Sequence, residues 1–371
     1  MNKIDWPLHK IFYNITHRCN LRCHYCYASS EPMTTENFLT LSEIESVAIQ
    51  GKECGAKQIL ISGGEPFIRK DWLDICKTFE KNNYDISISS NGSLINENIL
   101  KGLVNLISPP IFQISFDGTD DIINNICGVG NIAPNINNGI DKLIEYGFKV
   151  QLNCVLHTTN YFDIPYLVQY SYDKNVPIRF TLLNINYGRG ANEYSHGLTV
   201  NQVVKTIKAL HIARKANPLV ELNVPPLLLH PDDWFVISPS CGWARHMCGL
   251  LSDGSVTICG LSVGRKELIA GNVRQQNFRD IWQNSKLFTN LRKNDISQLR
   301  GICNSCPFIE ACGGSCRLTP YMEDGDFLGP NSLCQAYADG LMNNSINEND
   351  FPSGMIRLNM FETFEDVCQK N

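Results

Sequence analysis

The spacing of the cysteines constrains this chain more than any other feature. Eleven of its 16 cysteines fall in two groups, one of three within residues 19–26 and one of eight within residues 241–334. A chain of 371 residues without an apolar signal segment is unlike the small secreted proteins that depend on disulfide bonds. In a reducing compartment, such short spacings indicate metal ligands.

Composition and charge exclude several classes of function. The net charge is -5 and no run of basic residues is present, so nucleic acid is not an expected partner. No apolar run approaches the roughly 18 residues that a membrane-spanning helix needs. The first ten residues carry scattered charges and no apolar core, so we expect a cytoplasmic protein without a membrane partner.

Apolar β-branched runs alternate with amphipathic stretches over the first 215 residues, a pattern typical of parallel strands joined by helices. The expected strands are 10–16, 58–62, 85–90, 112–116, 149–155 and 178–183. The expected helices begin near Ser42 and then cover 70–82, 96–106, 132–146 and about 200–215. Six βα units predict an α/β fold, a partial (β/α)6 barrel with its chemistry at the carboxyl ends of the strands.

The first cysteine group, Cys19-x3-Cys23-x2-Cys26, lies on the loop expected after the first strand. Three thiolates hold three irons of a 4Fe-4S cluster and leave the fourth iron for a cofactor or substrate. A zinc site that borrows His17 or His24 is the alternative.

This array, with Tyr25 before the third cysteine, resembles the signature of radical S-adenosylmethionine (SAM) enzymes. The resemblance implies that the open iron binds the amino and carboxylate groups of SAM. The reduced cluster then cleaves SAM to a 5′-deoxyadenosyl radical, which abstracts a hydrogen atom from the substrate.

Polar residues after the later strands are similar to the SAM contacts of that family. Gly63, Gly64 and Glu65 follow the second strand, where glycines let the backbone approach and an acceptor meets the methionyl ammonium. For the other positions, a turn, a satisfied buried amide or a solvated loop is the alternative. These further candidates are Ser90 and Asn91, Ser115 and Asp117, Asn153, and Arg189 in a Gly-Arg-Gly loop.

The second group supplies eight thiolates, enough for two sites of four, and two zinc ribbons are the alternative. The order of its spacings resembles the SPASM extension of radical SAM enzymes. That resemblance implies two fully ligated auxiliary clusters and therefore three 4Fe-4S clusters in all. The implied ligand sets are Cys241, Cys248, Cys259 and Cys316 for one cluster, and Cys303, Cys306, Cys312 and Cys334 for the other. The expected domains are a barrel (1–215), a linker (216–240), a SPASM domain (241–340) and a tail (341–371).

Four of the five remaining cysteines carry no predicted chemistry. Cys54, Cys76 and Cys154 are expected to be small buried residues, and Cys368 is unassigned. Cys127 lies in a segment, 124–130, that we expect to form a loop on the catalytic face. A thiol there could donate a hydrogen atom, as a peptide epimerase requires, although an inert cysteine is the simpler interpretation.

The leading hypothesis for the substrate is a ribosomally made precursor peptide, modified by a crosslink, a thioether or an epimerised residue. Sulfatase-maturing relatives carry an acidic residue directly after the cysteine equivalent to Cys259, whereas this chain has Gly260. Side-chain modification of a tetrapyrrole and a non-catalytic electron carrier are the alternatives. The first strand is expected at Lys10, so a separate leader-binding protein or the tail would recognise the peptide. A flavodoxin or ferredoxin would supply electrons.

Overall fold

A computed structural model describes residues 5–32, 37–182, 188–192, 197–236 and 241–342 of the protein. Within them one sheet runs in the order β10-β9-β8-β1-β2-β3-β4-β5-β6-β7. Strands β1 to β7 are parallel, β8 lies parallel to β1, and β9 and β10 are antiparallel to their neighbours. The strands are β1 (Lys10–Asn14), β2 (Gln58–Ser62), β3 (Asp85–Ser90), β4 (Ile111–Ser115), β5 (Val150–Leu156), β6 (Ile178–Leu182), β7 (Val220–Asn223), β8 (Met247–Leu250), β9 (Ser255–Thr257) and β10 (Ile269–Asn272).

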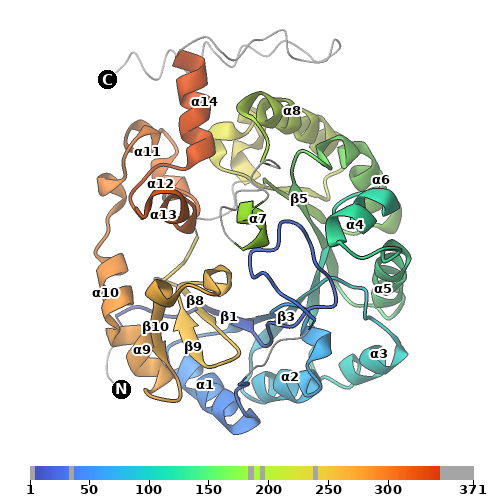
Figure 1. Ribbon diagram of the computed structural model, residues 1–371, viewed down its shortest axis with the longest axis vertical. Helices are drawn as coiled ribbons and strands as arrows, with labels where there is room; N and C mark the ends of the chain where they lie inside the picture. The colour runs from blue at the N-terminus through green and yellow to red at the C-terminus, as the bar shows by residue number, and fades with distance from the viewer. Residues whose placement is uncertain (1–4, 33–36, 183–187, 193–196, 237–240, 343–371) are drawn as a thin grey trace.

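The helices of the barrel lie outside the sheet, and Figure 1 shows them as an outer ring. Helix α1 begins at Leu41, slightly earlier than expected, because Thr40 caps it in a capping box with Glu43. These helices are α1 (Leu41–Glu53), α2 (Trp72–Lys81), α3 (Glu97–Leu103), α4 (Asp120–Cys127), α5 (Ala133–Glu145), α6 (Ile164–Lys174) and α8 (Val200–Ala216). The short helix α7 (Arg189–Asn192) lies inside this ring in Figure 1.

The two faces of the sheet differ in polarity. In β5, buried residues such as Leu152 and Cys154 alternate with partly exposed ones such as Asn153, the period of two of an extended strand. The buried face packs against the helices; for example, Ile114 of β4 lies near Ile136 of α5. The other face, called here the inner face, is therefore the surface that the curved sheet encloses.

All six predicted strands are present, and the α/β fold with a parallel sheet is confirmed. The stretch 216–240, expected to be a linker, contains β7, which pairs with β6 from Ile178 opposite Val220. Pattern reasoning missed this strand because it has only four residues and prolines follow at once.

The cysteine-rich region continues the barrel sheet. Strand β8 pairs with β1, and the β8–β9 turn passes through Gly254, which has a φ of 88°. Trp282 and Phe288 are buried in this region. Its helices are α9 (Phe278–Asn284), α10 (Lys286–Arg292), α11 (Ile302–Ser305), α12 (Ile309–Cys312), α13 (Leu318–Asp324) and α14 (Ser332–Met342).

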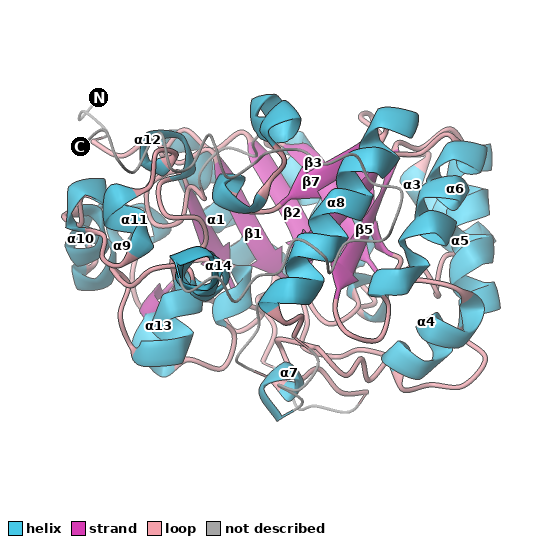
Figure 2. Cartoon of the chain, turned by 90° about the horizontal axis from the view of Figure 1, so that it is seen from above, coloured by secondary structure: helices cyan, strands magenta, loops and turns pink. Residues whose placement is uncertain are grey.

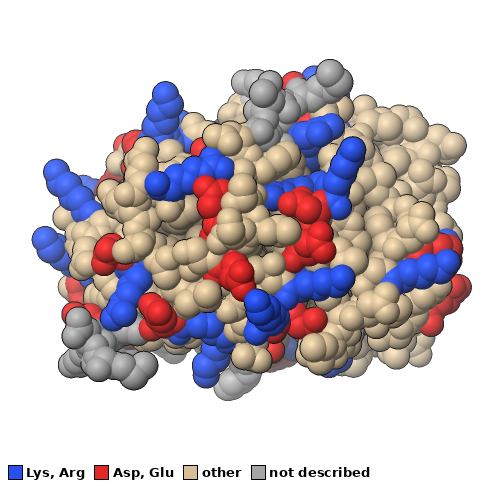
Figure 3. All heavy atoms as spheres, turned by 90° about the horizontal axis from the view of Figure 1, so that it is seen from below, with Lys and Arg blue, Asp and Glu red and all other residues tan. Residues whose placement is uncertain are grey.

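No helix in the described parts of the chain is long and apolar enough to cross a membrane. On the face shown in Figure 3, basic and acidic side chains lie intermixed. Figure 2 shows that α7 lies at one edge of the sheet, beside the loops that follow the parallel strands.

Candidate active site

The three cysteines of the first group occupy the loop after β1. The backbone N–H of Cys26 donates to the Cys23 carbonyl (3.2 Å), and the Cys19 thiol accepts from the N–H of Leu21 (3.4 Å). Burial, followed by the charge of Glu65 and with Cys23 and Cys26 contributing, raises the pKa of Cys19 to about 12. The three thiols thus lie close enough to act on one another electrostatically, as ligands of one cluster must.

The C-terminal end of α4 supports this loop. The N–H groups of Arg22 and His24 donate to the carbonyls of Cys127 (2.9 Å) and Ile126 (3.0 Å). Cys127 is the last residue of α4 and is buried, so the expectation of a loop at 124–130 is corrected for the residues up to Cys127. The Cys127 thiol lies beside that of Cys23, and the interaction of the two thiols, followed by burial, raises the pKa of Cys23.

Arg189, the first residue of α7, holds the same loop by hydrogen bonds. Its Nε donates to the carbonyl of Cys23 (3.1 Å) and its Nη1 to the carbonyl of Ser30 (2.9 Å). Its Nη2 is buried and has no hydrogen-bond partner among the described residues. Buried donors are normally paired, so this nitrogen fits an incoming anionic group such as the carboxylate of SAM.

Gly63, Gly64 and Glu65 pack directly on the backbone of the cysteine loop. The N–H groups of Gly64 and Glu65 donate to the carbonyls of Thr16 and Arg18, each over 2.8 Å. A Cβ atom at Gly64 would lie 2.2 Å from the Arg18 carbonyl oxygen, so only glycine permits this approach.

The Glu65 carboxylate is fully buried beside this loop. It accepts hydrogen bonds from the Ser90 hydroxyl (2.9 Å) and from the N–H groups of Asn91 (2.8 Å) and Phe67 (3.3 Å). Burial raises its pKa to about 7 against these bonds, and no described Lys or Arg contributes to the shift. A buried carboxylate without a cationic partner fits the ammonium group of SAM.

Asn91 connects β3 to the cysteine loop. Its Nδ2 donates to Oδ1 of Asn20 (3.0 Å) and lies 3.9 Å from the Cys19 sulfur. Its Oδ1 accepts from the N–H of Ser93 (2.9 Å). The side chain is therefore held beside the first cysteine by contacts within the protein.

Asp117 differs from Glu65 because protein donors already occupy its carboxylate. It accepts from the Tyr25 hydroxyl and from the N–H of Val155 (2.9 Å), and burial raises its pKa to about 6. Asp117 therefore positions Tyr25 of the cysteine loop. Ser115 and Asn153 pair in register and lie on the inner face of the sheet.

Three cysteines of the second group gather at one site. Cys241 is exposed as a residue, but desolvation of its thiol, followed by the charges of Cys316 and Cys259, raises its pKa to about 12, and Cys316 acts likewise on Cys259. Cys248 is not among them: the ionisable neighbours that perturb its thiol are Cys54 and Arg292. The structure thus brings together three of the four cysteines expected to share this cluster.

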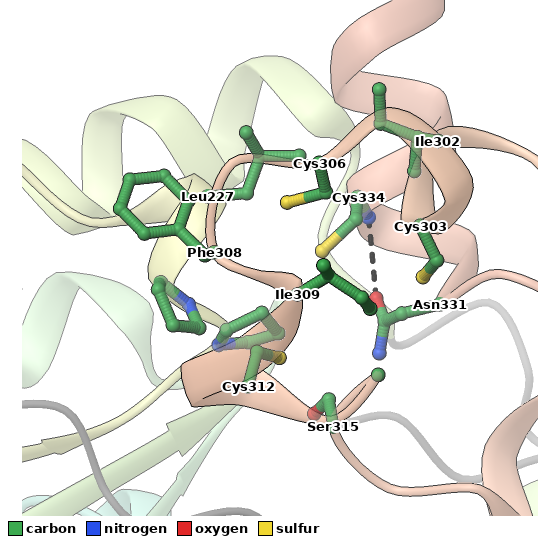
Figure 4. A pocket seen from close by; sticks show the side chains of 13 residues that line it. Leu227, Ile302, Cys303, Cys306, Phe308, Ile309, Cys312, Ser315, Asn331 and Cys334 are labelled. Atoms are coloured by element: carbon green, nitrogen blue, oxygen red, sulfur yellow. Dashed lines mark hydrogen bonds between the residues drawn. The ribbon is translucent and has the colours of Figure 1, made fainter. Parts of the chain in front are cut away.

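The other four cysteines line one pocket, and Figure 4 shows their sulfur atoms around it. Cys303 and Cys334 are buried, and the N–H of Cys334 donates to Oδ1 of Asn331 (3.2 Å). The pocket wall exposes only apolar surface, from Leu227, Phe308 and Ile309 among others. Four thiols in an apolar pocket fit a fully ligated iron-sulfur cluster. The set is Cys303, Cys306, Cys312 and Cys334.

Two residues that sequence reasoning missed, the buried Arg317 and the partly buried Tyr27, link these sites. Arg317 donates to the carbonyls of Gly329 (2.6 Å) and Phe327 (3.2 Å). Its guanidinium interacts electrostatically with five cysteines that belong to both auxiliary sets. The sequence signal for Arg317 is its position directly after Cys316, a predicted cluster ligand. The Tyr27 hydroxyl lies beside Ser62, and its pKa is raised by burial and then by the charges of Cys26 and Cys259, one from each group.

Gly260, the position of the base in sulfatase maturases, has no room for a side chain. A Cβ there would lie 2.1 Å from the ring of Phe12. Its carbonyl accepts from Nδ2 of Asn14 (2.8 Å), which fixes the backbone against β1. A carboxylate base at this position is incompatible with the packing.

The family described as the Radical SAM superfamily matches residues 13–170, and SPASM, described as an iron-sulfur cluster-binding domain, matches residues 241–307. The chain is 24% identical over 340 residues to the AdoMet-dependent heme synthase of Methanosarcina barkeri, covering 87% of this chain and 95% of that protein. It is 26% identical over 334 residues to the PqqA peptide cyclase of Bradyrhizobium diazoefficiens, covering 87% and 85%.

The fold is similar to the crystal structure of Streptococcus suis SuiB bound to precursor peptide SuiA. The TM-score is 0.71 at 17% identity, and the match covers 89% of this chain and 76% of that one. At this level of identity the likeness concerns the fold.

Proposed function

Because this chain belongs to the radical SAM superfamily and carries a SPASM iron-sulfur domain, we propose that it modifies a ribosomally made precursor peptide. The modification is a crosslink, a thioether or an epimerised residue. Both a peptide cyclase and a heme synthase are among its relatives, so the kind of substrate has to be inferred from the residues of the site.

The residues of the first site have distinct proposed roles. Cys19, Cys23 and Cys26 hold the radical SAM cluster, Glu65 receives the methionyl ammonium and Arg189 Nη2 meets the carboxylate. When bound, the reduced cluster and SAM supply the 5′-deoxyadenosyl radical that removes a hydrogen atom. The α4 end and Arg189 keep the cysteine loop in place through the contacts described above.

The observation that carries the peptide proposal is the chemistry of the inner face. Consecutive strands place Ser115, Asn153, Thr181 and Asn223 on it, and each is at least partly exposed. Hydroxyl and amide side chains both donate and accept, which suits the alternating N–H and C=O groups of a peptide backbone.

A tetrapyrrole would instead favour free cations on this face for its carboxylates. Arg179 of β6 lies there, but its guanidinium is bonded to Glu221 of β7 (2.8 Å). Burial lowers the pKa of Lys10, and repulsion from the nearby Arg179 lowers it further. Glu221 thus compensates the charge of Arg179 on the inner face.

The electron balance separates the possible products. Forming a crosslink or thioether removes two hydrogen atoms from the peptide: one goes to 5′-deoxyadenosine, and the other leaves as a proton and an electron. Auxiliary clusters held by the cysteines of the second group would supply an acceptor for that electron. Epimerisation needs no acceptor, since a hydrogen atom returns to the same carbon. A flavodoxin or ferredoxin and a separate leader-binding protein are the proposed partners.

The test begins with 5′-deoxyadenosine release by anaerobically reconstituted enzyme, compared with the combined Cys19→Ala, Cys23→Ala and Cys26→Ala variant. We expect about twelve irons in the wild type and about eight in the variant, from four irons per cluster, with release lost. Each short peptide encoded beside the gene is then co-expressed and examined by mass spectrometry. Loss of two hydrogen atoms, or deuterium uptake from heavy water, supports the proposal.

Tetrapyrrole side-chain modification is the second candidate because the heme synthase relative matches over 95% of its length. If iron coproporphyrin, and no neighbouring peptide, raised 5′-deoxyadenosine release and lost carbon dioxide, this second function would replace the first.

A further inference from the structure

The pairing of β8 with β1 determines which way the Cys248 side chain points. The parallel register places Cys248 opposite Ile11 and Gly249 opposite Phe12. Adjacent residues of a strand point to opposite faces of the sheet. Cys248 and Gly249 therefore face different surroundings.

Gly249 and Phe12 face the side on which Cys259 lies. A Cβ at Gly249 would lie 2.5 Å from the carbonyl carbon of Cys259, and the Phe12 ring packs on Gly260. This is the inner face, where the Asn14 side chain also reaches Gly260. The site of Cys241, Cys259 and Cys316 therefore lies on the inner-face side of β1 and β8.

Cys248 and Ile11 face the helices. The Cδ1 atom of Ile11 lies 3.0 Å from the position of a Cβ at Gly51 in α1. Cys248 is fully buried, as is Cys54 at the end of α1, and Arg292 lies near both thiols. Cys241, Cys259 and Cys316 are not among the charges that act on Cys248.

We propose that the first auxiliary cluster is held by only three protein thiolates, from Cys241, Cys259 and Cys316, and that Cys248 is a core residue. One iron then has a coordination position open to an anionic ligand from outside the domain. A thiolate is the ligand that iron in a sulfide cluster prefers. A substrate thiol would bind there as thiolate and release its proton to solvent. This deepens the proposed function by giving the auxiliary site a direct role in substrate binding.

The described surroundings of the three cysteines offer no better fourth ligand. The hydroxyl of Ser262 is 3.7 Å from the Cys259 sulfur, but serine is not a usual ligand of these clusters. His246 stacks on His9 with ring centroids 4.9 Å apart. Cys368 lies outside the described residues, so the test includes it.

The location of the three-cysteine site suits contact with substrate. Tyr27 lies between it and the first cysteine group, since the charges of Cys26, Cys259 and Cys19 all act on its hydroxyl. A ligand on the open iron would therefore be held near the place where the radical forms. By contrast, two cysteines of the second auxiliary site are buried in an apolar pocket.

The experiment uses full-length protein with Cys19→Ala, Cys23→Ala and Cys26→Ala combined, which removes the first open iron. To this background we add Cys248→Ala and, as a matched control in the same buried pair, Cys54→Ala. We expect about eight irons in all three proteins, from four per cluster, and a loss of about four when Cys316→Ala is added instead. Cys368→Ala should also leave about eight.

Pulsed electron paramagnetic resonance with 13C-cyanide as the probe then tests for the open iron. We expect 13C coupling to a reduced cluster in the background and in Cys248→Ala, and its loss in Cys316→Ala. Absence of coupling in the background, or iron loss in Cys248→Ala or Cys368→Ala but not in Cys54→Ala, would overturn the proposal. Neither readout needs SAM or a substrate, so failure of the peptide hypothesis would be seen separately.

Discussion

The proposed role of Glu65 makes SAM binding depend on pH in a defined direction. Burial raises the Glu65 pKa to about 7, and only the ionised carboxylate attracts an ammonium group. Affinity contributed by Glu65 is therefore present above this pKa and is lost as the pH falls through it. At pH 6 about one carboxylate in eleven is ionised, so this contribution falls about tenfold between pH 8 and pH 6.

The change that isolates this effect is Glu65→Gln. Glutamine keeps the shape and loses the charge-assisted hydrogen bond, worth about 1.5 to 3 kcal/mol, which predicts a SAM affinity about tenfold to a hundredfold lower at pH 8. The amino group of SAM also titrates in this range. The quantity to compare is therefore the ratio of wild-type to variant affinity, in which that titration cancels.

Anaerobic equilibrium dialysis of SAM with reconstituted protein at pH 6, 7 and 8 measures the ratio. We expect the ratio to rise about tenfold from pH 6 to pH 8. Iron content determined in parallel must be the same in both proteins. A ratio that stays constant over this range, or equal affinities at pH 8, would refute the assignment of Glu65 as the ammonium acceptor.

Three further changes test other contacts. Gly260→Ala should destabilise the fold by about 1 to 3 kcal/mol through overlap with Phe12, seen as a lower Tm, and adding Phe12→Ala should recover part of it. Arg317→Gln should lower the reduction potentials of the auxiliary clusters in a redox titration, because a buried cation stabilises the added electron, and Arg317→Lys should lower them less. Cys127→Ala should keep 5′-deoxyadenosine release but abolish epimerised product if its thiol is the hydrogen donor; an unchanged product assigns it to packing against Cys23.

Local patterns predicted the elements that depend on neighbouring residues. Strand β2 and the glycines after it are recognisable because an apolar run, a turn and a carboxylate follow one another within a few residues. The contact of Glu65 with Ser90 and Asn91 follows from the pairing of neighbouring parallel strands, whose ends meet at one edge.

The orientation of Cys248 could not be predicted in this way. It depends on the register between β8 and β1, which are far apart in sequence, and a shift of one residue would turn the thiol to the other face. The spacing of the cysteines gives their number and separation, but it does not show which face of a strand each one occupies. The hydrogen bond from Tyr25 to Asp117 could not be predicted for a similar reason, because it joins the cysteine loop to the segment after β4, and the two are far apart in sequence.

The shared sheet also limits how this protein can be divided or recombined. Removing everything after residue 240 would strip β8 from β1 and leave the backbone groups of Lys10 to Tyr13 as an open edge. Such edges promote intermolecular pairing, so an isolated barrel should aggregate. A chimera that exchanges cysteine-rich regions between relatives would have to carry β8 with its own β1. The unit of exchange in this architecture is therefore a pair of strands, β1 and β8, that lie far apart in the sequence.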